Sequence, residues 1–364
     1  MHAARSKTLR VGVVGVGERG RAYARALADG AVSGAALAAV TDIAPSALAA
    51  FPSVPHFTDA AALLAAGLLD AVVIATPPAL HALHTRQALV SGLHVLTEKP
   101  LASRLADCKR LRAEIEHAGR HGRVVSTAFP LRADLRYHEL AGLLERRDIG
   151  RLQRVHWTVT DCFRTDAYYR ASTWRATRDG EGGGVLLNQA LHQLDLWQLL
   201  FGMPRRVQGF CAFGRFHAIE VEDQVTAFFE HADGMTGVFV ASTGEPLGTN
   251  RLEIHGSRGR IALEGSELVV ERTGHTLSDG ALRARISAPE DVERRVLTVG
   301  GVSPAGMLQN FVAAILEGAP LLSPASDGTR AVELAHAIFA SSDARAPVDL
   351  SIESVTQASA PAMS

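Results

Sequence analysis

The stretch LRVGVVGVGERG, residues 9–20, decides the fold of the N-terminal part of this chain. Its first half is apolar and rich in valine, which predicts a buried β-strand. Its second half holds Gly15, Gly17 and Gly20 in GxGxxG spacing, and a helical pattern follows. This order is typical of a dinucleotide-binding βαβ unit, in which Gly15 permits the tight turn, Gly17 admits the pyrophosphate and Gly20 lets the helix approach the strand. The alternative is a structural turn that binds nothing.

Strand and helix patterns alternate from this turn to about residue 128. Further strands are predicted at Ala36–Val40, Ala71–Ala75, His94–Leu96 and Val124–Thr127, and helices at 20–29, 45–50, 81–91 and 102–118. The third strand, AVVIA, has no polar position, as expected for a strand buried on both faces. Strands that alternate with helices form a parallel, doubly wound sheet, so the fold class of this part is α/β.

The pattern changes after residue 129. A helix is predicted over Leu131–Glu145, with its apolar positions at Leu135, Leu140, Leu143 and Leu144. Seven strand-like segments separated by turns follow, at Gln153–Thr160, Val207–Phe213, Gln224–Glu230, Thr236–Ala241, Arg251–His255, Arg260–Leu263 and Glu267–Glu271. They predict an α+β domain with a mostly antiparallel sheet. Two more helices are predicted near 305–317 and 327–340.

The length of 364 residues suggests two domains, at roughly 100–200 residues each. We predict a dinucleotide-binding domain at 1–128, a substrate-binding and oligomerisation domain at 129–350, and a polar tail at 351–364. The helices within 305–340 are expected to pack back toward the first domain. An apolar outer face of the second sheet would favour a homodimer or a homotetramer.

The composition argues against several classes of protein. Lys plus Arg number 37 and Asp plus Glu number 38, so a net charge of -1 gives no reason to expect nucleic acid or an anionic membrane as partner. No apolar run reaches the ~18 residues of a membrane-spanning helix, and the polar N-terminus lacks the apolar segment of a secretion signal. Three separated cysteines fit neither a disulfide framework nor a zinc site. We therefore expect a cytoplasmic protein that binds no metal.

Asp42 ends the second predicted strand, where a dinucleotide-binding unit carries its ribose ligand. A carboxylate there accepts both hydroxyls of the adenosine ribose and repels a 2′-phosphate. Ile43 supplies no phosphate ligand, so the pair favours NAD over NADP. We expect both residues, with Glu18 and Arg19 of the glycine turn, to line the cofactor site. The alternative for Asp42 is an N-cap of the next helix.

Two more loops follow the carboxyl ends of parallel strands, where ligands bind in such sheets. Thr76, Pro77 and His81 follow the third strand, and Glu98 and Lys99 follow the fourth. All five are predicted to contact the cofactor. The ammonium group of Lys99 can also donate to a substrate hydroxyl and stabilise a developing alkoxide, which makes this lysine a catalytic candidate. The alternative is an ordinary salt bridge on the surface.

The most informative stretch is EGGGVLLNQALHQLD, residues 181–195. Three glycines precede a predicted helix on which Asn188 and His192 share a face, with Asp195 close to the histidine. A neutral imidazole can take the proton of an alcohol as hydride leaves its carbon, so His192 is the candidate general base and Asn188 a candidate substrate ligand. The alternative is a buried helix with one satisfied histidine.

The loop before the glycines supplies further candidate substrate ligands. Tyr169 and Trp174, with the neighbouring Tyr168, offer aromatic faces that pack on sugar C–H groups. Arg175 offers a guanidinium for a carboxylate or phosphate, and Arg132 is a further candidate early in the second domain. The alternative is a loop that packs over the helix without touching substrate.

The combined motifs resemble the Gfo/Idh/MocA family of oxidoreductases. They are GxGxxG with Asp42, TPP before His81, EKP at residues 98–100, the triple glycine with Asn188, His192 and Asp195, and MLQNFVAAI at 307–315 with Asp-Gly at 327–328. The likeness therefore covers nearly the whole chain. It implies an N-terminal Rossmann domain and a C-terminal domain with a large open sheet.

The resemblance also implies a reaction. Members carry out NAD(P)-dependent oxidation or reduction at a secondary alcohol or ketone of a sugar, a sugar nucleotide or an inositol-like polyol. By position, catalysis falls to Lys99 and His192. Many members have aspartate where this chain has Asn188, and asparagine cannot relay a proton as a carboxylate does, which leaves the proton pathway open.

Two other functions stay open at this point. A hydrolase or lyase could retain NAD and use transient oxidation to drive an elimination, with the same lysine and histidine. A regulator could bind the nucleotide and a sugar without turnover, but the presence of Lys99 and His192 favours an enzyme.

Overall fold

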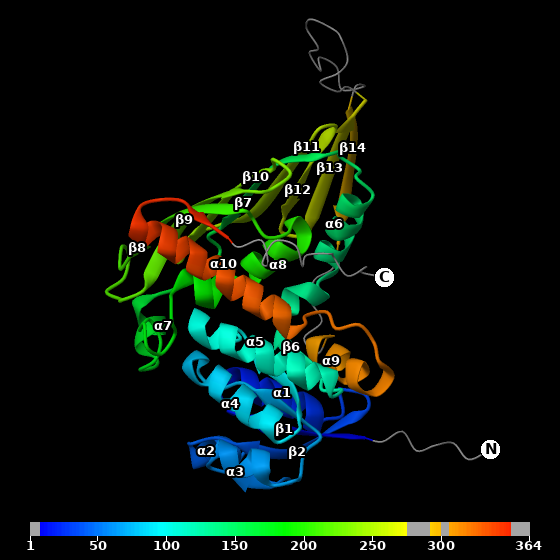
Figure 1. Ribbon diagram of the computed structural model, residues 1–364, viewed down its shortest axis with the longest axis vertical. Helices are drawn as coiled ribbons and strands as arrows, with labels where there is room; N and C mark the ends of the chain where they lie inside the picture. The colour runs from blue at the N-terminus through cyan, green and yellow to red at the C-terminus, as the bar shows by residue number, and fades with distance from the viewer. Residues whose placement is uncertain (1–7, 275–291, 300–305, 351–364) are drawn as a thin grey trace, which may run out of the picture. The chain divides into compact units, whose positions relative to one another are not determined.

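The computed structural model describes residues 8–274, 292–299 and 306–350, which form two compact units (Figure 1). Unit 1 contains residues 8–133, Arg178–Gly182 and 306–332. Unit 2 contains Asp134–Thr177, 183–274, 292–299 and 333–350. The two helices predicted near 305–317 and 327–340 are described from residue 306 onward, and the predicted tail at 351–364 lies outside the described residues.

Unit 1 is built on a six-stranded sheet in which every neighbouring pair of strands is parallel. The order across the sheet is β3 (His56–Phe57), β2 (Ala35–Thr41), β1 (Leu9–Val14), β4 (Ala71–Ile74), β5 (His94–Glu98) and β6 (Val125–Ala128). Chain order reverses between β1 and β4, which is the switch point of a doubly wound fold. Every residue of β4 is buried, as its uninterrupted apolar sequence predicts. The predicted parallel sheet is confirmed.

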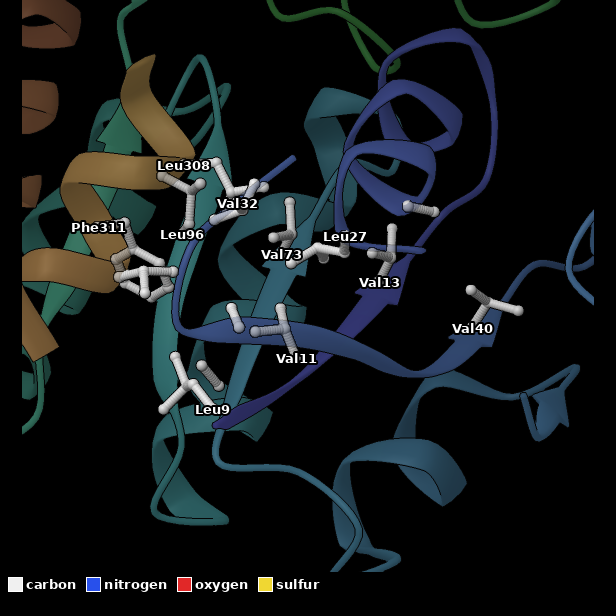
Figure 2. Packing of buried hydrophobic residues seen from close by; sticks show 14 of the residues in the cluster. Leu9, Val11, Val13, Leu27, Val32, Val40, Val73, Leu96, Leu308 and Phe311 are labelled. Carbon is white, nitrogen blue, oxygen red and sulfur yellow. The ribbon is translucent and has the colours of Figure 1, made fainter. Parts of the chain in front are cut away.

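Helices cover both faces of this sheet. They are α1 (Glu18–Ala28), α2 (Pro45–Leu48), α3 (Ala60–Ala65), α4 (Pro78–Val90), α5 (Leu105–Arg120) and α9 (Gly306–Glu317), with a 3-10 turn, η1, at Pro130–Ala133. One face packs on α1 and α9, and Figure 2 shows Leu308 and Phe311 of α9 in the same cluster as Leu96 of β5. The other face packs on α3, α4 and α5. Two short elements, β3 and α3, were not predicted, because two residues and an alanine-rich segment carry little periodic contrast.

Unit 2 is built on a nine-stranded sheet. The order is β14 (Val292–Thr298), β13 (Glu267–Thr273), β12 (Gly259–Glu264), β11 (Asn250–Gly256), β7 (Leu152–Val159), β10 (Thr236–Ser242), β9 (Glu222–Glu230), β8 (Arg206–Phe213) and β15 (Val348–Asp349). Only β7 and β10 pair in parallel, so the predicted mostly antiparallel sheet is confirmed. The two edge strands were not predicted. The sequence of β14, VERRVLT, has four exposed residues in a row, so it lacks an alternating pattern.

The helices of unit 2 are α6 (Leu135–Glu145), α7 (Asp166–Arg170), a π-helix η2 (Val185–Gln189) and α8 (Leu191–Phe201), and α10 (Ala325–Ala344) is divided between the two units. The single helix predicted over Leu131–Glu145 is wrong, because Asp134 caps α6 by accepting from the N–H of Arg136 at 2.9 Å. Leu135, predicted to be apolar core, opens the capped helix and is 57% exposed. None of the helices among the described residues is long and apolar enough to cross a membrane.

A histidine is buried in the aromatic core of unit 2. Trp197 of α8 packs edge-on against Phe229, with ring centroids 4.7 Å apart, and its Nε1–H donates to Nε2 of His231 at 3.3 Å. His231 is 7% exposed, and burial lowers the pKa of its imidazole to about 4. This histidine is therefore neutral in the folded protein near pH 7.

Acid should weaken unit 2 through His231. The folded-state pKa lies below the unfolded value of about 6.5, so the contribution to stability is complete above pH 6.5 and is lost as the pH falls toward 4. Between pH 7 and pH 5 we expect the free energy of unfolding to drop by about 2 kcal/mol more in the natural protein than in His231→Phe. Urea unfolding followed by tryptophan fluorescence measures this difference. His121→Gln, at an exposed position, serves as the control, and an equal pH response in all three proteins would contradict the assignment.

Candidate functional site

The glycine turn of unit 1 has the shape that a dinucleotide needs. Gly15 has φ of +87°, a conformation that favours glycine, and a Cβ there would lie 2.8 Å from the carbonyl oxygen of Ala75. A Cβ on Gly20 would overlap the carbonyl oxygen of Gly15. Gly17 is exposed, and a Cβ there would meet nothing within 4 Å. The first and third glycines are thus required by packing, whereas the second leaves an open approach to the backbone.

Helix α1 begins directly at this turn. Gly17 is its N-cap, and no side chain caps the helix, which leaves the positive end of its dipole available to phosphate oxygens. Glu18 and Arg19 are the first two helical residues, and both are exposed. They lie beside the open approach to Gly17.

Asp42 connects the end of β2 to the glycine turn. Its Oδ2 accepts from the N–H of Val16 at 2.7 Å, and its Oδ1 accepts from the N–H of Ala44 at 2.9 Å. The N-cap of α2 is Ala44, so Asp42 lies two residues before the N-cap and is not the N-cap itself. A carboxylate has about four acceptor positions, and two therefore remain for ribose hydroxyls. The next residue, Ile43, is 91% exposed and offers no polar group.

This geometry predicts how cofactor preference can be changed. Asp42→Ser with Ile43→Arg removes the charge that repels a 2′-phosphate and adds a guanidinium that binds it. We expect the Kd for NADP to fall about 10- to 100-fold and the Kd for NAD to rise, because a hydrogen bond to a charged group is worth about 1.5–3 kcal/mol. Equilibrium titration with both reduced cofactors measures this, with Ile43→Arg alone as the control. Tighter binding of NADP than of NAD by the natural protein would contradict the placement of Asp42 on the ribose.

A buried histidine ties together the two loops that follow β4 and β5. His81, in the first turns of α4, is 1% exposed, and its Nδ1 and Nε2 lie 2.7 Å from the carbonyl oxygens of Pro100 and Thr76. Burial lowers the pKa of this imidazole, and the two carbonyl oxygens oppose that shift. These contacts hold the loop at Thr76 and Pro77 against the loop at Lys99, and a contact of His81 with the cofactor stays a prediction.

The loop after β4 holds a polar atom that lacks a protein partner. Oγ1 of Thr76 is buried and forms no hydrogen bond with any described residue. A buried hydroxyl in this state is unfavourable unless a ligand or water satisfies it. Together with the open Gly17 and the spare acceptor positions of Asp42, this hydroxyl fits a bound dinucleotide.

Glu98 and Lys99 end β5. Glu98 accepts from the hydroxyl of Tyr23 at 2.8 Å and from the backbone N–H of Lys99 at 3.2 Å. Burial, and then the charge of Glu98, raise the pKa of Tyr23 well above its usual value, so the phenol stays protonated. Lys99 is half-buried. Glu98 therefore fixes the backbone from which the lysine side chain extends.

In unit 2, the segment after the triple glycine is not one uniform helix, and that prediction is wrong. Val185–Gln189 is a π-helix, closed by the bond from the N–H of Ala190 to the carbonyl oxygen of Val185 at 2.7 Å, and α8 begins only at Leu191. Asn188 lies in the π-helix and His192 in the α-helix, so the two residues do not belong to one regular α-helix. Short π-helical segments of this kind occur often at functional sites.

Glu222 holds the start of this π-helix. This buried carboxylate accepts from the N–H of Gly184 at 2.8 Å and from the N–H of Leu186 at 2.9 Å. A Cβ on Gly184 would overlap the carbonyl oxygen of Glu222, which explains a glycine at that position. Asn188, Gln189 and His192 are half-buried, whereas Leu187, Leu191 and Leu194 are fully buried.

Asp195 lies deeper than its predicted place beside His192 suggests. It is 0% exposed and accepts from Nε2 of Gln198 at 3.1 Å. Nδ2 of Asn188 lies 3.4 Å from the hydroxyl of Tyr168.

The remaining substrate candidates separate into two groups. Tyr169 is 8% exposed, and its hydroxyl donates to Oγ1 of Thr243 at 3.0 Å, whereas Trp174 and Arg175 are half-buried. Arg132 lies in unit 1 and is 0% exposed. Its Nη1 donates to Asp327 at 2.7 Å and to the carbonyl oxygen of Leu322 at 2.8 Å. These contacts give Arg132 a structural role in place of the predicted substrate contact.

Among the residues with described coordinates, no group of three or more His, Cys, Asp or Glu side chains could hold a metal ion. Sequence reasoning missed Glu222 as a determinant of the site. Glu222 lies 36 and 38 residues from the N–H groups that it binds, so no local pattern announces it.

Two family models match the chain. A model described as an oxidoreductase family with a NAD-binding Rossmann fold matches residues 9–129, and a model of the GFO/IDH/MocA C-terminal domain matches residues 137–262. The chain is 26% identical, over 91% of its length and 96% of the relative, to inositol 2-dehydrogenase of Rhizobium meliloti (strain 1021).

A second relative is matched over a shorter span. The chain is 35% identical over 198 residues to 1-carboxy-3-chloro-3,4-dihydroxycyclohexa-1,5-diene dehydrogenase of Comamonas testosteroni, which is 53% of the chain and 47% of that relative. The chain thus spans about half the length of this relative. The crystal structure of the WlbA dehydrogenase of Bordetella pertussis, in complex with NADH and UDP-GlcNAcA, matches this chain with a TM-score of 0.79 at 24% identity. The match covers 95% of this chain and 99% of the WlbA chain. This likeness shows a shared fold.

Proposed function

Because the chain belongs to the Gfo/Idh/MocA family of NAD-dependent oxidoreductases, we propose that it transfers a hydride between NAD and a secondary alcohol or ketone of a sugar, a sugar nucleotide or an inositol-like polyol. The observation that carries this proposal is the match of family models to both domains in a chain that retains Lys99 and His192. The full-length likeness to a protein named inositol 2-dehydrogenase supports a polyol as the substrate.

The N-terminal domain supplies the groups that would hold the cofactor. The backbone at Gly17 and the start of α1 suit the pyrophosphate, and Asp42 suits the adenosine ribose. Thr76 offers its buried hydroxyl as a donor or acceptor. When bound, NAD supplies the acceptor for the substrate hydride.

The catalytic roles follow from the chemistry of two side chains. Lys99 donates to the substrate oxygen and stabilises the alkoxide that forms during oxidation. His192 accepts the hydroxyl proton, and Asn188 donates to or accepts from a substrate hydroxyl. Asparagine does not exchange protons at neutral pH, so the proton passes to solvent from the histidine without a carboxylate relay at that position.

The test is an assay of net redox turnover. Purified protein is mixed with NAD and a panel of inositols, hexoses and sugar nucleotides, and the absorbance band of reduced nicotinamide is followed beside substrate loss. We expect one reduced nicotinamide per substrate oxidised. Product without net reduction of NAD would replace this proposal with a hydrolase or lyase that retains its cofactor, and binding without product would replace it with a regulator.

We also propose that the protein is a homodimer or homotetramer. Phe210 of β8 is 61% exposed and Phe228 of β9 is 39% exposed, on the same face of the sheet as Val238 of β10. Exposed aromatic groups that gather on one face favour association. Sedimentation equilibrium measures the mass, and a monomer at micromolar concentration would contradict this proposal.

A further inference from the structure

Two arginines in unit 2 stack on one tyrosine. Cζ of Arg164 lies 4.8 Å from the centroid of the Tyr168 ring, and Cζ of Arg175 lies 4.6 Å from it. Arg175 also lies over the ring of Trp174, at 5.0 Å. We call Arg164, Tyr168 and Arg175 the arginine–tyrosine stack. The ring attracts each cation, but the two cations repel one another, so the stack concentrates positive charge.

No carboxylate within residues 8–274, 292–299 and 306–350 forms an ion pair with either arginine of the stack. The one hydrogen bond that their side chains donate within these residues runs from Nη1 of Arg164 to the carbonyl oxygen of Phe163, at 2.9 Å. Nε of Arg164 and Nε of Arg175 are both shielded from solvent and have no hydrogen-bond partner in the described part of the chain. Shielded guanidinium nitrogens without partners are unfavourable, and two in one cluster point to a ligand that accepts hydrogen bonds.

Two acidic side chains near the stack are engaged elsewhere. The carboxylate of Asp223 accepts from the backbone N–H groups of residues 215–217 at 2.7–3.1 Å and lies 3.2 Å from Nδ1 of His217. Asp166, at the start of α7, lies 3.9 Å from Arg170. Neither carboxylate forms an ion pair with Arg164 or Arg175, so both guanidinium groups can bind an oxyanion ligand.

The backbone that carries the stack is held in place. The N–H of Arg164 donates to the carbonyl oxygen of Thr243 at 3.0 Å, and the carbonyl oxygen of Arg164 lies 2.9 Å from Nε2 of His217. Ala176, next to Arg175, has φ of +59°, and its carbonyl oxygen accepts from the N–H of Glu220 at 3.3 Å. A non-glycine residue in this conformation is strained, and such strain is found most often beside ligand sites.

The stack adjoins the proposed substrate ligands. The hydroxyl of Tyr168 lies 3.4 Å from Nδ2 of Asn188 and 3.5 Å from Nε2 of Gln189, so one aromatic ring separates the guanidinium groups from the π-helix. A substrate held at Asn188 can therefore extend a second group along Tyr168 to the arginines.

We propose that the arginine–tyrosine stack binds an oxyanion, a carboxylate or a phosphate, that the substrate carries. This inference rests on the proposed function, because it assigns the anion to the molecule that is oxidised or reduced. A guanidinium group matches two oxygens of a carboxylate or phosphate with parallel hydrogen bonds, and it can do so while it stacks on a ring. The substrate class is accordingly an acidic sugar, a sugar phosphate or a carboxylated polyol, in preference to a neutral hexose or inositol.

The test compares matched compounds on the full-length protein. Glucose, galactose and mannose are each assayed with NAD beside their uronates and 6-phosphates, and myo-inositol beside its 1-phosphate. We expect kcat/KM to favour an anionic member over its neutral partner by at least about tenfold in one series, and the preferred anion to tell carboxylate from phosphate. Arg175→Met should lower kcat/KM for that anion about 10- to 100-fold through KM, with kcat little changed and the neutral partner unaffected.

Two variants serve as controls. Arg170→Met removes an exposed arginine of the same loop that is paired with Asp166, and it should change none of these values. Arg175→Lys keeps the charge without the planar fork, and it should show an intermediate KM if Arg175→Met fails to fold.

The outcomes separate this inference from the proposed function. Turnover of neutral members equal to that of the anions, or an equal loss for both in Arg175→Met, would overturn the anion site and leave the oxidoreductase intact. If no compound reacts, calorimetric titration of the uronates and phosphates into NADH-loaded protein decides the matter. Binding that is weakened by Arg175→Met but not by Arg170→Met would support the stack, and absent or unchanged binding would overturn it.

Discussion

Replacing His192 with alanine should lower kcat by roughly 10²–10⁴-fold, which is the span of a positioned general base. His192 is half-buried and is the second residue of α8. Its imidazole follows the π-helix whose start is held by Glu222. Its loss should also remove the acidic limb of the pH–rate profile, because the proposed proton acceptor, which must be deprotonated to act, is gone. Steady-state rates from pH 5 to pH 9 measure both effects.

Asn188→Ala is the matched comparison for this histidine variant. This variant removes a neutral hydrogen bond to the substrate, which is worth about 0.5–1.5 kcal/mol, so the expected fall in kcat is about tenfold or less. The pH limb should survive in this variant. If Asn188→Ala is as damaging as His192→Ala, and the limb persists without the histidine, the proton leaves by another route, and Lys99 becomes the first candidate for the base.

Lys99→Ala should lower kcat by at least about 10²-fold and leave the melting temperature nearly unchanged. The backbone N–H of this residue donates to Glu98, so the alanine variant keeps the hydrogen bond that ends β5. Lys99 is half-buried, so we expect its loss to affect the chemical step more than folding. Turnover and thermal unfolding measured on the same preparation test this separation.

Lys109→Ala, at an exposed position of α5, is the control for the loss of a positive charge. A Lys99→Ala protein that melts far earlier, with normal turnover in the folded fraction, would show that Lys99 is structural.

In the double variant with His192→Ala, two groups that act on one hydroxyl should show strong non-additivity, so the double loss of kcat should be little larger than the greater single loss.

The sequence alone determined the parallel sheet and the glycine turn, because both depend on neighbours along the chain. Valine-rich strands that alternate with helices leave one compact way to bury their apolar faces. Gly15 and Gly20 are forced by contacts with each other and with the residues that directly follow strand β4, so their spacing is sufficient to predict the turn. The mostly antiparallel second sheet followed equally from strands separated by short turns.

The tertiary structure decided the partners of the buried charges. Arg132 pairs with Asp327, 195 residues away, and Glu222 of β9 binds the start of the π-helix that carries Asn188, so Asn188 and His192 do not belong to one regular α-helix. A charged side chain requires a partner once it is buried, but its identity does not specify which distant residue the fold will bring to it. For this reason local patterns located the turn and the histidine segment, whereas only the folded chain shows that Arg132 is engaged and that Arg164 and Arg175 gather on Tyr168.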